Sequence, residues 1–132
     1  MKLSVFIRTY RSDFDWLCYC LERVRKHIKY DEIVICTPHD TLLLRRVNVD
    51  DCKIIKVREF TSGYIAQQAD KLNAWKWCEG DVIMFVDSDT MFYKNITVDD
   101  FISDGKINLL RTRYSQIHTH WQDIVEKASC LS

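Results

Sequence analysis

Asp87 and Asp89 are the residues of this sequence whose types and spacing are best suited to chemistry. An apolar run rich in β-branched side chains, residues 82–86, leads directly into them and predicts a central strand buried on both faces. Because an unpaired charge is too costly inside such a strand, the acids should emerge at its carboxyl end, where open α/β sheets hold their ligands. Two neighbouring carboxylates repel each other and favour a shared cation. The pattern therefore predicts a divalent metal that holds a phosphate-bearing substrate.

A second acidic pair with the same spacing, Asp13 and Asp15, has a simpler interpretation. It stands at the start of a helical pattern, where acids cap the first turn and favour the positive end of the helix dipole. Asp87 and Asp89 could likewise serve only to cap a turn. Their position directly after a buried strand distinguishes them from the first pair and favours the metal site.

Strands and helices alternate along the part of the chain that must position these acids. The runs typical of strands are residues 3–7, 33–36, 54–57 and 82–86. Helical apolar periodicity occurs at residues 14–28, 41–47 and 64–78. This alternation predicts a single domain with an α/β fold, in which a mostly parallel, Rossmann-like sheet is flanked by helices. Farther along we expect a short helix at residues 97–103, a strand at 106–113 and a terminal amphipathic helix at 115–130.

The helix predicted at residues 64–78 supplies a second part of the site. It directly precedes the acidic strand, so its N-terminus should open at the same edge of the sheet. Helical spacing places Tyr64, Gln68, Lys71 and Trp75 on one side. A helix N-terminus attracts anions, and Lys71 adds a positive charge for a phosphate group. The alternative is a solvated polar helix face with Trp75 in the core.

Polar residues also follow the first two predicted strands. Arg8, Thr9 and Tyr10 come directly after the first strand, where the ring can stack on a base and the other two side chains can bond a ribose or a phosphate. An ordinary polar loop is the alternative. Asp40 follows the second strand and could accept a hydrogen bond from a base or ribose, or cap the next helix.

Two histidines, His118 and His120, fall in the terminal helical pattern. Their spacing points them in different directions, so they cannot chelate one ion together. His120 is a candidate third metal ligand, and a surface histidine is the alternative. The sequence has no G-x-G-x-x-G, no G-x-x-x-x-G-K and no nucleophile elbow, so dinucleotide-binding Rossmann, P-loop and α/β-hydrolase sites lack their motifs.

The composition limits the partners and the compartment. Lys+Arg and Asp+Glu are both 19, and this balance argues against a nucleic-acid binder. The six cysteines include no C-x-x-C pair, and we expect Cys18, Cys20, Cys36 and Cys78 to be small, reduced core residues. Reduced thiols, no leader sequence and no apolar stretch of the roughly 20 residues that span a bilayer predict a cytoplasmic protein without a transmembrane segment.

Taken together, these features resemble the nucleotide-sugar-binding half of a GT-A glycosyltransferase. The resemblance covers roughly residues 1–113 and rests on Phe-Ile-Arg-Thr-Tyr at residues 6–10, Gln-Gln at 67–68 with Lys-Leu at 71–72, and Phe-Val-Asp-Ser-Asp at 85–89. In that family a D-x-D motif follows a central strand of an α/β fold and binds Mn²⁺ or Mg²⁺ through the diphosphate of a sugar donor. The resemblance implies transfer of a sugar from a nucleoside-diphosphate sugar to an acceptor that the sequence does not identify.

The resemblance also implies roles for particular residues. Asp87 and Asp89 would contact the metal and the ribose, and the implied nucleotide-sugar-binding residues are Arg8, Thr9, Tyr10, Asp40, Gln68, Lys71, Asp87 and Ser88. Most such enzymes continue well past the D-x-D motif, so we expect the acceptor-binding part here to be short or missing. A partner protein or a second copy of the chain would then supply the acceptor side. Asp123 and Glu126 are the late acids available as catalytic residues.

Two other functions fit parts of the pattern. A degenerate transferase would bind a nucleotide or sugar without catalysis, keeping the metal site and lacking a base. The D-x-D at residues 87–89 also fits the first part of the D-x-D-x-T motif of haloacid-dehalogenase-type phosphatases, in which the first Asp attacks phosphate, but Thr90 comes one position too early for the rest of that motif. In those proteins the motif comes early in the chain, so this resemblance is only local.

Overall fold

The computed structural model describes residues 1–38, 47–58 and 62–108, and the chain divides into two compact units, Met1–Phe101 and Ile102–Ser132. The main elements of the first unit are β1 (Leu3–Arg8), α1 (Phe14–His27), β2 (Glu32–Pro38), β3 (Cys52–Val57), α2 (Gly63–Asn73) and β4 (Val82–Asp87). Its described residues also form the short 3₁₀ helices η1 (Arg11–Asp13), η3 (Ala74–Lys76) and η4 (Val98–Asp100). In the second unit, β5 (Ile102–Ser103) pairs antiparallel with β6 (Lys106–Ile107).

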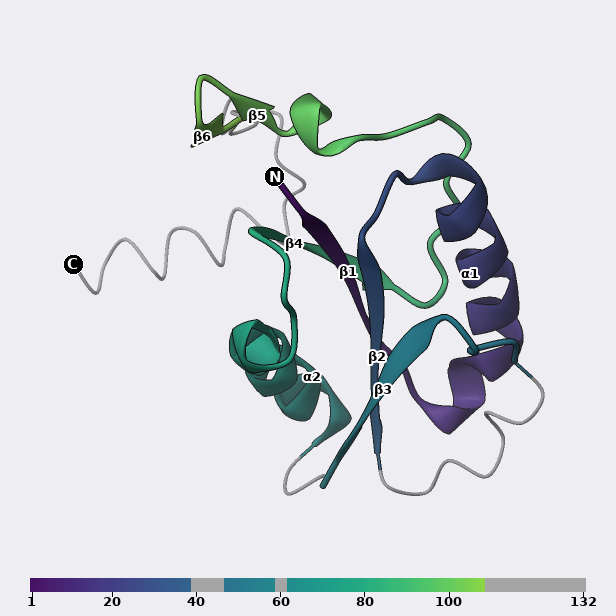
Figure 1. The fold of residues 1–132 in the computed structure, drawn as a ribbon. Helices are drawn as coiled ribbons and strands as arrows, with labels where there is room; N and C mark the ends of the chain where they lie inside the picture. The colour runs from purple at the N-terminus through teal and green to yellow at the C-terminus, as the bar shows by residue number, and fades with distance from the viewer. Residues whose placement is uncertain (39–46, 59–61, 109–132) are drawn as a thin grey trace, which may run out of the picture. The chain divides into compact units, whose positions relative to one another are not determined.

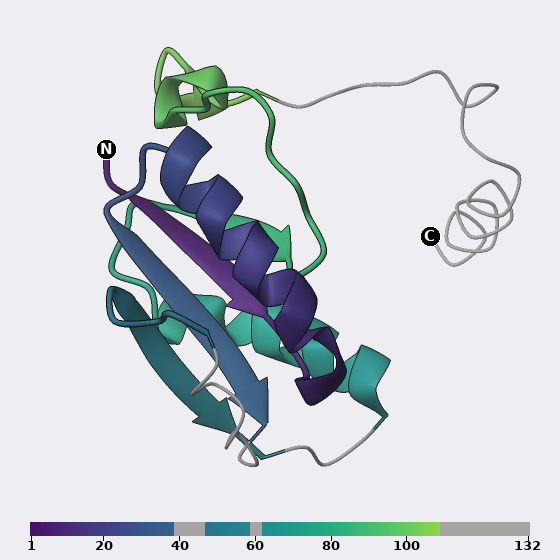
Figure 2. The ribbon, with the colours of Figure 1, turned by 90° about the vertical axis from the view of Figure 1, so that its right-hand side faces the viewer.

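The first unit is built on a parallel sheet with the strand order β3-β2-β1-β4 (Figure 1). The chain moves outward from β1 through β2 to β3, and then crosses back to place β4 on the other side of β1. The order of strands therefore reverses between β1 and β4, where the register pairs Arg8 with Asp87. Helices α1 and α2 cover opposite faces of the sheet (Figures 1 and 2). The predicted α/β class, with a parallel sheet flanked by helices, is confirmed.

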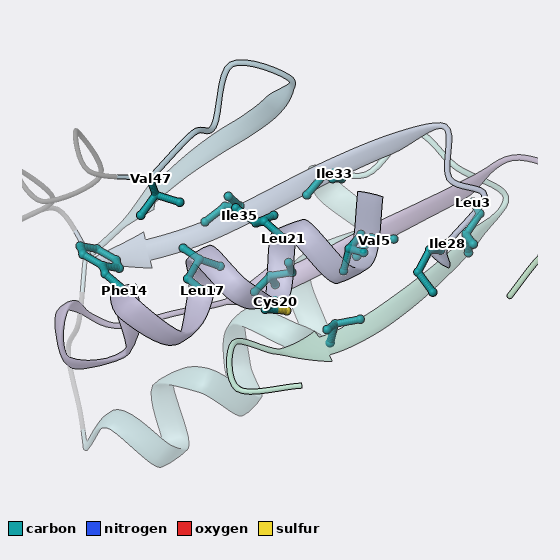
Figure 3. Packing of buried hydrophobic residues seen from close by; sticks show 13 residues of the cluster. Leu3, Val5, Phe14, Leu17, Cys20, Leu21, Ile28, Ile33, Ile35 and Val47 are labelled. Carbon is teal, nitrogen blue, oxygen red and sulfur yellow. The ribbon is translucent and has the colours of Figure 1, made fainter. Parts of the chain in front are cut away.

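Side chains alternate between the two faces of β1 because a strand has a two-residue period. Leu3, Val5 and Ile7 face α1, and Phe6 lies in the cluster on the α2 side with Ala74. The larger cluster is seen from close by in Figure 3, and its members from α1 are Phe14, Leu17, Cys20, Leu21 and Val24. Full burial of each large apolar side chain stabilises the fold by about 1.5–3 kcal/mol.

Strand β4 is not the central, doubly buried strand that the sequence predicted. It lies at the edge of the four-stranded sheet formed by the described residues, and along it only Val86 is buried. Phe85 is 49% exposed, and its ring meets Phe6 edge-on at a centroid distance of 5.8 Å. An apolar run of this length does not distinguish a strand covered on both faces from one that packs against its neighbour at a sheet edge. The central, fully buried strand is β1.

The segment after β4 also differs from prediction. In place of a helix at residues 97–103, the chain forms η4, stabilised by a capping box between Thr97 and Asp100, and then enters β5. Asp104 and Gly105 have positive φ angles of 52° and 72°, so they make the two-residue turn that joins β5 to β6. The predicted strand at 106–113 begins with β6, and its later part lies outside the described residues, as do the helices predicted at 41–47, apart from Val47, and at 115–130.

The helix predicted at 64–78 is α2 followed by η3, so the regular α-helix ends earlier than expected. Among the cysteines expected in the core, Cys20 and Cys36 are buried and Cys78 is half-buried, whereas Cys18 is exposed and its prediction is wrong. Its stretch of α1 carries apolar residues on more than one side, so spacing alone did not separate inside from outside. None of the helices in the described part of the chain has the length and apolar character to cross a bilayer.

Candidate functional site

A cleft of about 590 Å³ opens at the carboxyl ends of β1 and β4. It lies where the strand order reverses, and in open α/β sheets the helices diverge there and leave a crevice for ligands. Its walls come from the end of β1, the start of α1, α2 and the turn after β4. The lining residues are Arg8, Tyr10, Asp13, Trp16, Gln67, Asp87, Ser88 and Asp89.

The turn that follows β4 presents two carboxylates to this cleft. Asp87 is the last residue of β4, and the amide of Thr90 donates to its carbonyl at 3.0 Å, which closes the turn. Asp87 and Asp89 are exposed and line the cleft, whereas Ser88 between them is buried. The two-residue spacing thus places both acids on the solvent side.

Asp13 contributes a third carboxylate to the cleft. It occupies the N-cap position of α1 but makes no capping hydrogen bond with its side chain. Instead its Oδ2 accepts a long hydrogen bond of 3.5 Å from the Ser88 hydroxyl. Asp13 therefore has the N-cap position that the sequence predicted, but its side chain does not cap the helix. The side chain joins the start of α1 to the acidic turn instead.

Helix α2 reaches the acidic turn from the other side. Lys71 Nζ lies 2.9 Å from Asp87 Oδ1, and Gln67 Nε2 reaches the same oxygen at 3.4 Å. Gln67 and Lys71 are one helical turn apart, so both side chains extend from the same face of α2. This face brings one positive charge and one amide donor to the D-x-D turn.

A buried ion pair fixes the end of β1 to α2 beneath the cleft. Arg8 Nε lies 2.7 Å from Asp70 Oδ2, and the side chain of Arg8 is 0% exposed. Its guanidinium also donates to the Thr9 carbonyl at 2.7 Å and lies 4.3 Å from the centroid of the Tyr10 ring. The Tyr10 hydroxyl donates to the carbonyl of Gly63, the first residue of α2. Arg8 therefore holds the cleft wall in place more than it offers a charge to a ligand.

The buried thiol of Cys20 lies under the acidic turn. Its Sγ is 3.6 Å from the Asp87 carbonyl oxygen, and burial, reinforced by the nearby negative charges of Asp89 and Asp87, raises the pKa of this thiol to about 11. Cys20 is therefore protonated at neutral pH in the ligand-free protein.

The donor set fits a hard divalent cation. Asp87 and Asp89 offer carboxylate oxygens, the ligands that Mg²⁺ and Mn²⁺ prefer. The part of the chain that the structure describes contains no group of three His, Cys, Asp or Glu side chains arranged to hold a metal. Mg²⁺ commonly binds through one or two carboxylates and completes its shell with water and substrate phosphates. Two cleft carboxylates therefore suit a metal that binds together with a phosphate ligand better than one held by protein alone.

The structure brings several predicted site residues together and leaves others out. Arg8, Tyr10, Asp87, Ser88 and Asp89 line one cleft, and Lys71 contacts its edge through Asp87.

Thr9 and Gln68 do not line this cleft. Thr9 is buried, with its amide bonded to the Cys36 carbonyl at 3.0 Å, and Gln68 is exposed on α2. Trp75 is 67% exposed, which excludes the alternative that placed it in the core. The predicted residues Asp40, His120, Asp123 and Glu126 lie outside the described residues.

Sequence reasoning missed three cleft residues as members of the site, Asp13, Trp16 and Gln67. Asp13 and Trp16 share the first turn of α1, which directly follows the β1 loop, and the position of that turn at the ligand edge of a parallel sheet was the available signal. Gln67 entered the sequence analysis only as part of the Gln-Gln pair at residues 67–68. Its spacing of four residues from Lys71 would have selected it.

Comparisons with known proteins do not add to this description, because no family model, no curated protein and no solved structure matches the chain.

Proposed function

We propose that this protein binds a nucleoside-diphosphate sugar together with Mn²⁺ or Mg²⁺ and transfers the sugar to an acceptor. The observation that carries the proposal is the position of Asp87 and Asp89, which line one cleft at the point of the sheet where the strand order reverses. The cleft volume of about 590 Å³ lies within the range of roughly 300–1,000 Å³ that small-molecule sites occupy.

Each wall of the cleft would have its own task. Asp87 and Asp89 would hold the metal, which when bound neutralises the diphosphate and stabilises it as a leaving group. Lys71 and Gln67 stand beside Asp87 and would donate to the phosphate oxygens. Trp16 is 55% exposed at the cleft and offers a ring face on which a base or a sugar can stack.

Binding without transfer is the second candidate function. Within the described part of the cleft, Asp13 is the only carboxylate besides the D-x-D pair, and its Oδ2 already accepts a hydrogen bond from Ser88. These residues suit a donor-binding site, and they leave the acceptor side without an assigned base. A nucleotide-sugar-binding module would have this arrangement.

A thermal-shift panel tests the proposal. UDP, GDP and CMP, and their sugar conjugates, are each added with and without Mn²⁺, because only ligands that prefer the folded state raise the unfolding midpoint. We expect at least one diphosphate to raise the midpoint only when Mn²⁺ is present. If no nucleotide changes the midpoint with Mn²⁺ present, the proposed function is wrong.

Turnover then separates the candidate activities. Metal-dependent release of the nucleoside diphosphate from a sugar conjugate supports the transferase, and tight binding without release supports the binding module. Release of inorganic phosphate from a simple phosphomonoester, without nucleotide binding, would instead support the phosphatase hypothesis.

A further inference from the structure

Lys71 forms an ion pair with Asp87, a carboxylate that a bound metal would need as a ligand. Its ammonium lies 2.9 Å from Asp87 Oδ1, and the Gln67 amide reaches the same oxygen. An ammonium in this position opposes a divalent cation in two ways, because it engages the lone pairs of the oxygen and repels the incoming positive charge. In the ligand-free protein Asp87 is therefore held in a state that disfavours a metal ion by itself.

The contact between Lys71 and Asp87 is suited to exchange. The Asp87 side chain is 58% exposed and that of Lys71 is 21% exposed, so the pair lies at the surface, where such pairs add little net stability. The flexible four-carbon stem of lysine lets its ammonium move while α2 stays in place. Arg8 differs, because its buried guanidinium is bonded to Asp70. Of these two described cations, Lys71 is thus the one whose ammonium can move to a ligand in the cleft.

We propose that Lys71 makes metal binding and diphosphate binding depend on each other. In the free protein it neutralises Asp87, and when both ligands arrive it moves from Asp87 to the diphosphate. This inference rests on the function proposed above and adds to it the way in which the two ligands are coupled.

The charges around the cleft give the reason for this coupling. A diphosphate alone meets the carboxylates of Asp13 and Asp89 beside the pair of Asp87 and Lys71, and its approach is opposed by repulsion. A divalent cation that binds alone must displace the ammonium of Lys71 from Asp87. The ammonium then has no new anion to pair with. When both bind, Lys71 exchanges one anionic partner for another, so neither penalty remains. By thermodynamic linkage, each ligand then raises the affinity for the other by the same factor.

Calorimetric titration of Mn²⁺ into three variants tests the proposal, each with and without UDP or GDP. Lys71→Met removes the charge and keeps the length of the side chain, and Lys71→Arg keeps the charge. Lys76→Met is the matched control, since Lys76 is exposed on η3 and lies 5.5 Å from the Trp75 ring centroid. We expect Lys71→Met to bind Mn²⁺ alone about tenfold more tightly than the wild type and to lose about tenfold of the coupling factor.

Lys71→Arg should retain most of the coupling, and Lys76→Met should resemble the wild type in every titration. The proposal is overturned if Lys71→Met binds Mn²⁺ alone no more tightly than the wild type, or if Lys76→Met produces the same gain. Failure of the proposed function is seen separately. In that case the wild type does not bind any nucleotide with Mn²⁺, whereas the comparison of Mn²⁺ affinities still decides whether Lys71 competes for Asp87.

Discussion

Acidic side chains lie at both ends of the parallel strands, at the amino edge where the strands begin and at the carboxyl edge where they end. Their contacts differ between these two edges. At the amino edge, Asp31 Oδ2 accepts from the amide of Leu3 at 2.7 Å, and Asp81 Oδ2 accepts from the amide of Lys2 at 2.8 Å. These carboxylates stabilise the amino edge because they accept hydrogen bonds from backbone amides where strands begin. At the carboxyl edge, the two exposed acids of the D-x-D turn line a cleft instead.

Glu32 shows most clearly how the amino edge uses its acids. Its carboxylate accepts from the Ser4 hydroxyl and from the amide of Glu79. Burial acts to raise the pKa of Glu32, but the hydrogen bonds from Ser4 and from the amides of Glu79 and Gly80 outweigh it and hold this pKa below its ordinary value. Gly80 is required here, because a Cβ at this position would clash with Ser4 and with the Lys2 carbonyl.

The two edges show that the environment, and not the residue type, separates acids that bond to the backbone from acids that face a cleft. A backbone amide that donates to a carboxylate cannot leave it for a ligand without a shift of the chain itself. At the cleft, Asp87 Oδ1 accepts instead from the ends of two long side chains of α2, Gln67 and Lys71. Ligands can replace such partners at small cost, whereas replacing a backbone donor would disrupt the sheet.

The largest effect on stability is expected at the carboxyl edge, beneath the cleft, at the buried pair formed by Arg8 and Asp70. In Asp70→Asn the guanidinium of Arg8, whose side chain is 0% exposed, loses the carboxylate charge beside its Nε. We expect the free energy of unfolding to fall by about 3 kcal/mol in urea titrations. Glu79→Gln is the control, because this side chain is 82% exposed and its ion pair with Lys53 is long at 3.5 Å. A loss below about 1 kcal/mol for Asp70→Asn would show that the pair does not fix the cleft wall.

At the amino edge, we predict that Glu32→Gln lowers stability and leaves ligand binding alone. The substitution removes the negative charge from the group that accepts hydrogen bonds from the Ser4 hydroxyl and from the amides of Glu79 and Gly80. The free energy of unfolding should therefore fall by about 1–2 kcal/mol. Metal-dependent nucleotide affinity should stay within about twofold of the wild type, since Glu32 lies at the opposite edge. A large loss of affinity without a loss of stability would contradict the claim that acids at the amino edge stabilise the fold and do not contribute to ligand binding.

Asp51, which directly precedes β3, gives a smaller effect that depends on pH. The hydrogen bond from Arg25, acting against a smaller effect of burial, lowers the pKa of Asp51 from 3.8 to about 2. A depressed carboxyl pKa contributes stability above the unfolded-state value and loses it as the pH falls toward the folded-state value. Because the side chain is 44% exposed, we expect Asp51→Asn to cost only about 0.5–1 kcal/mol at pH 6.

The cost of Asp51→Asn should shrink steadily between pH 4 and pH 2 in urea titrations of the variant and the wild type. A cost that stays constant over this interval would show that the ion pair with Arg25 does not account for the contribution of Asp51 to stability.

Much of the fold followed from the sequence because its elements have strong periodicity. The stripe of α1 and the alternation of strands with helices predicted the parallel sheet, and the apolar run before Asp87 predicted a strand that ends at the ligand edge. The hairpin at Asp104 and Gly105 was missed although an Asp-Gly pair is a strong turn signal, because residues 97–103 were predicted as a helix and no strand was expected before the pair.

The site was less predictable because it depends on contacts between elements. The ion pair of Arg8 with Asp70 joins β1 to α2, and these residues are far apart in the sequence, so residue spacing does not predict it. The edge position of β4 depends on which strands pair, and apolar composition does not determine pairing. The choice of Gln67 over Gln68 at the cleft follows from a rotation of α2 that only packing against the sheet sets.

The central claim is that the acids of the D-x-D turn bind a ligand and are not needed for the fold. The most direct measurement is the calorimetric affinity of Asp89→Asn for UDP and GDP with Mn²⁺, beside the wild type and Glu32→Gln. We predict a loss of about 100-fold, because removing a metal ligand should cost at least as much as removing one of its supporting residues. The unfolding free energy of this variant should stay within about 0.5 kcal/mol of the wild type. Unchanged metal-dependent affinity in Asp89→Asn, with the fold intact, would contradict the claim.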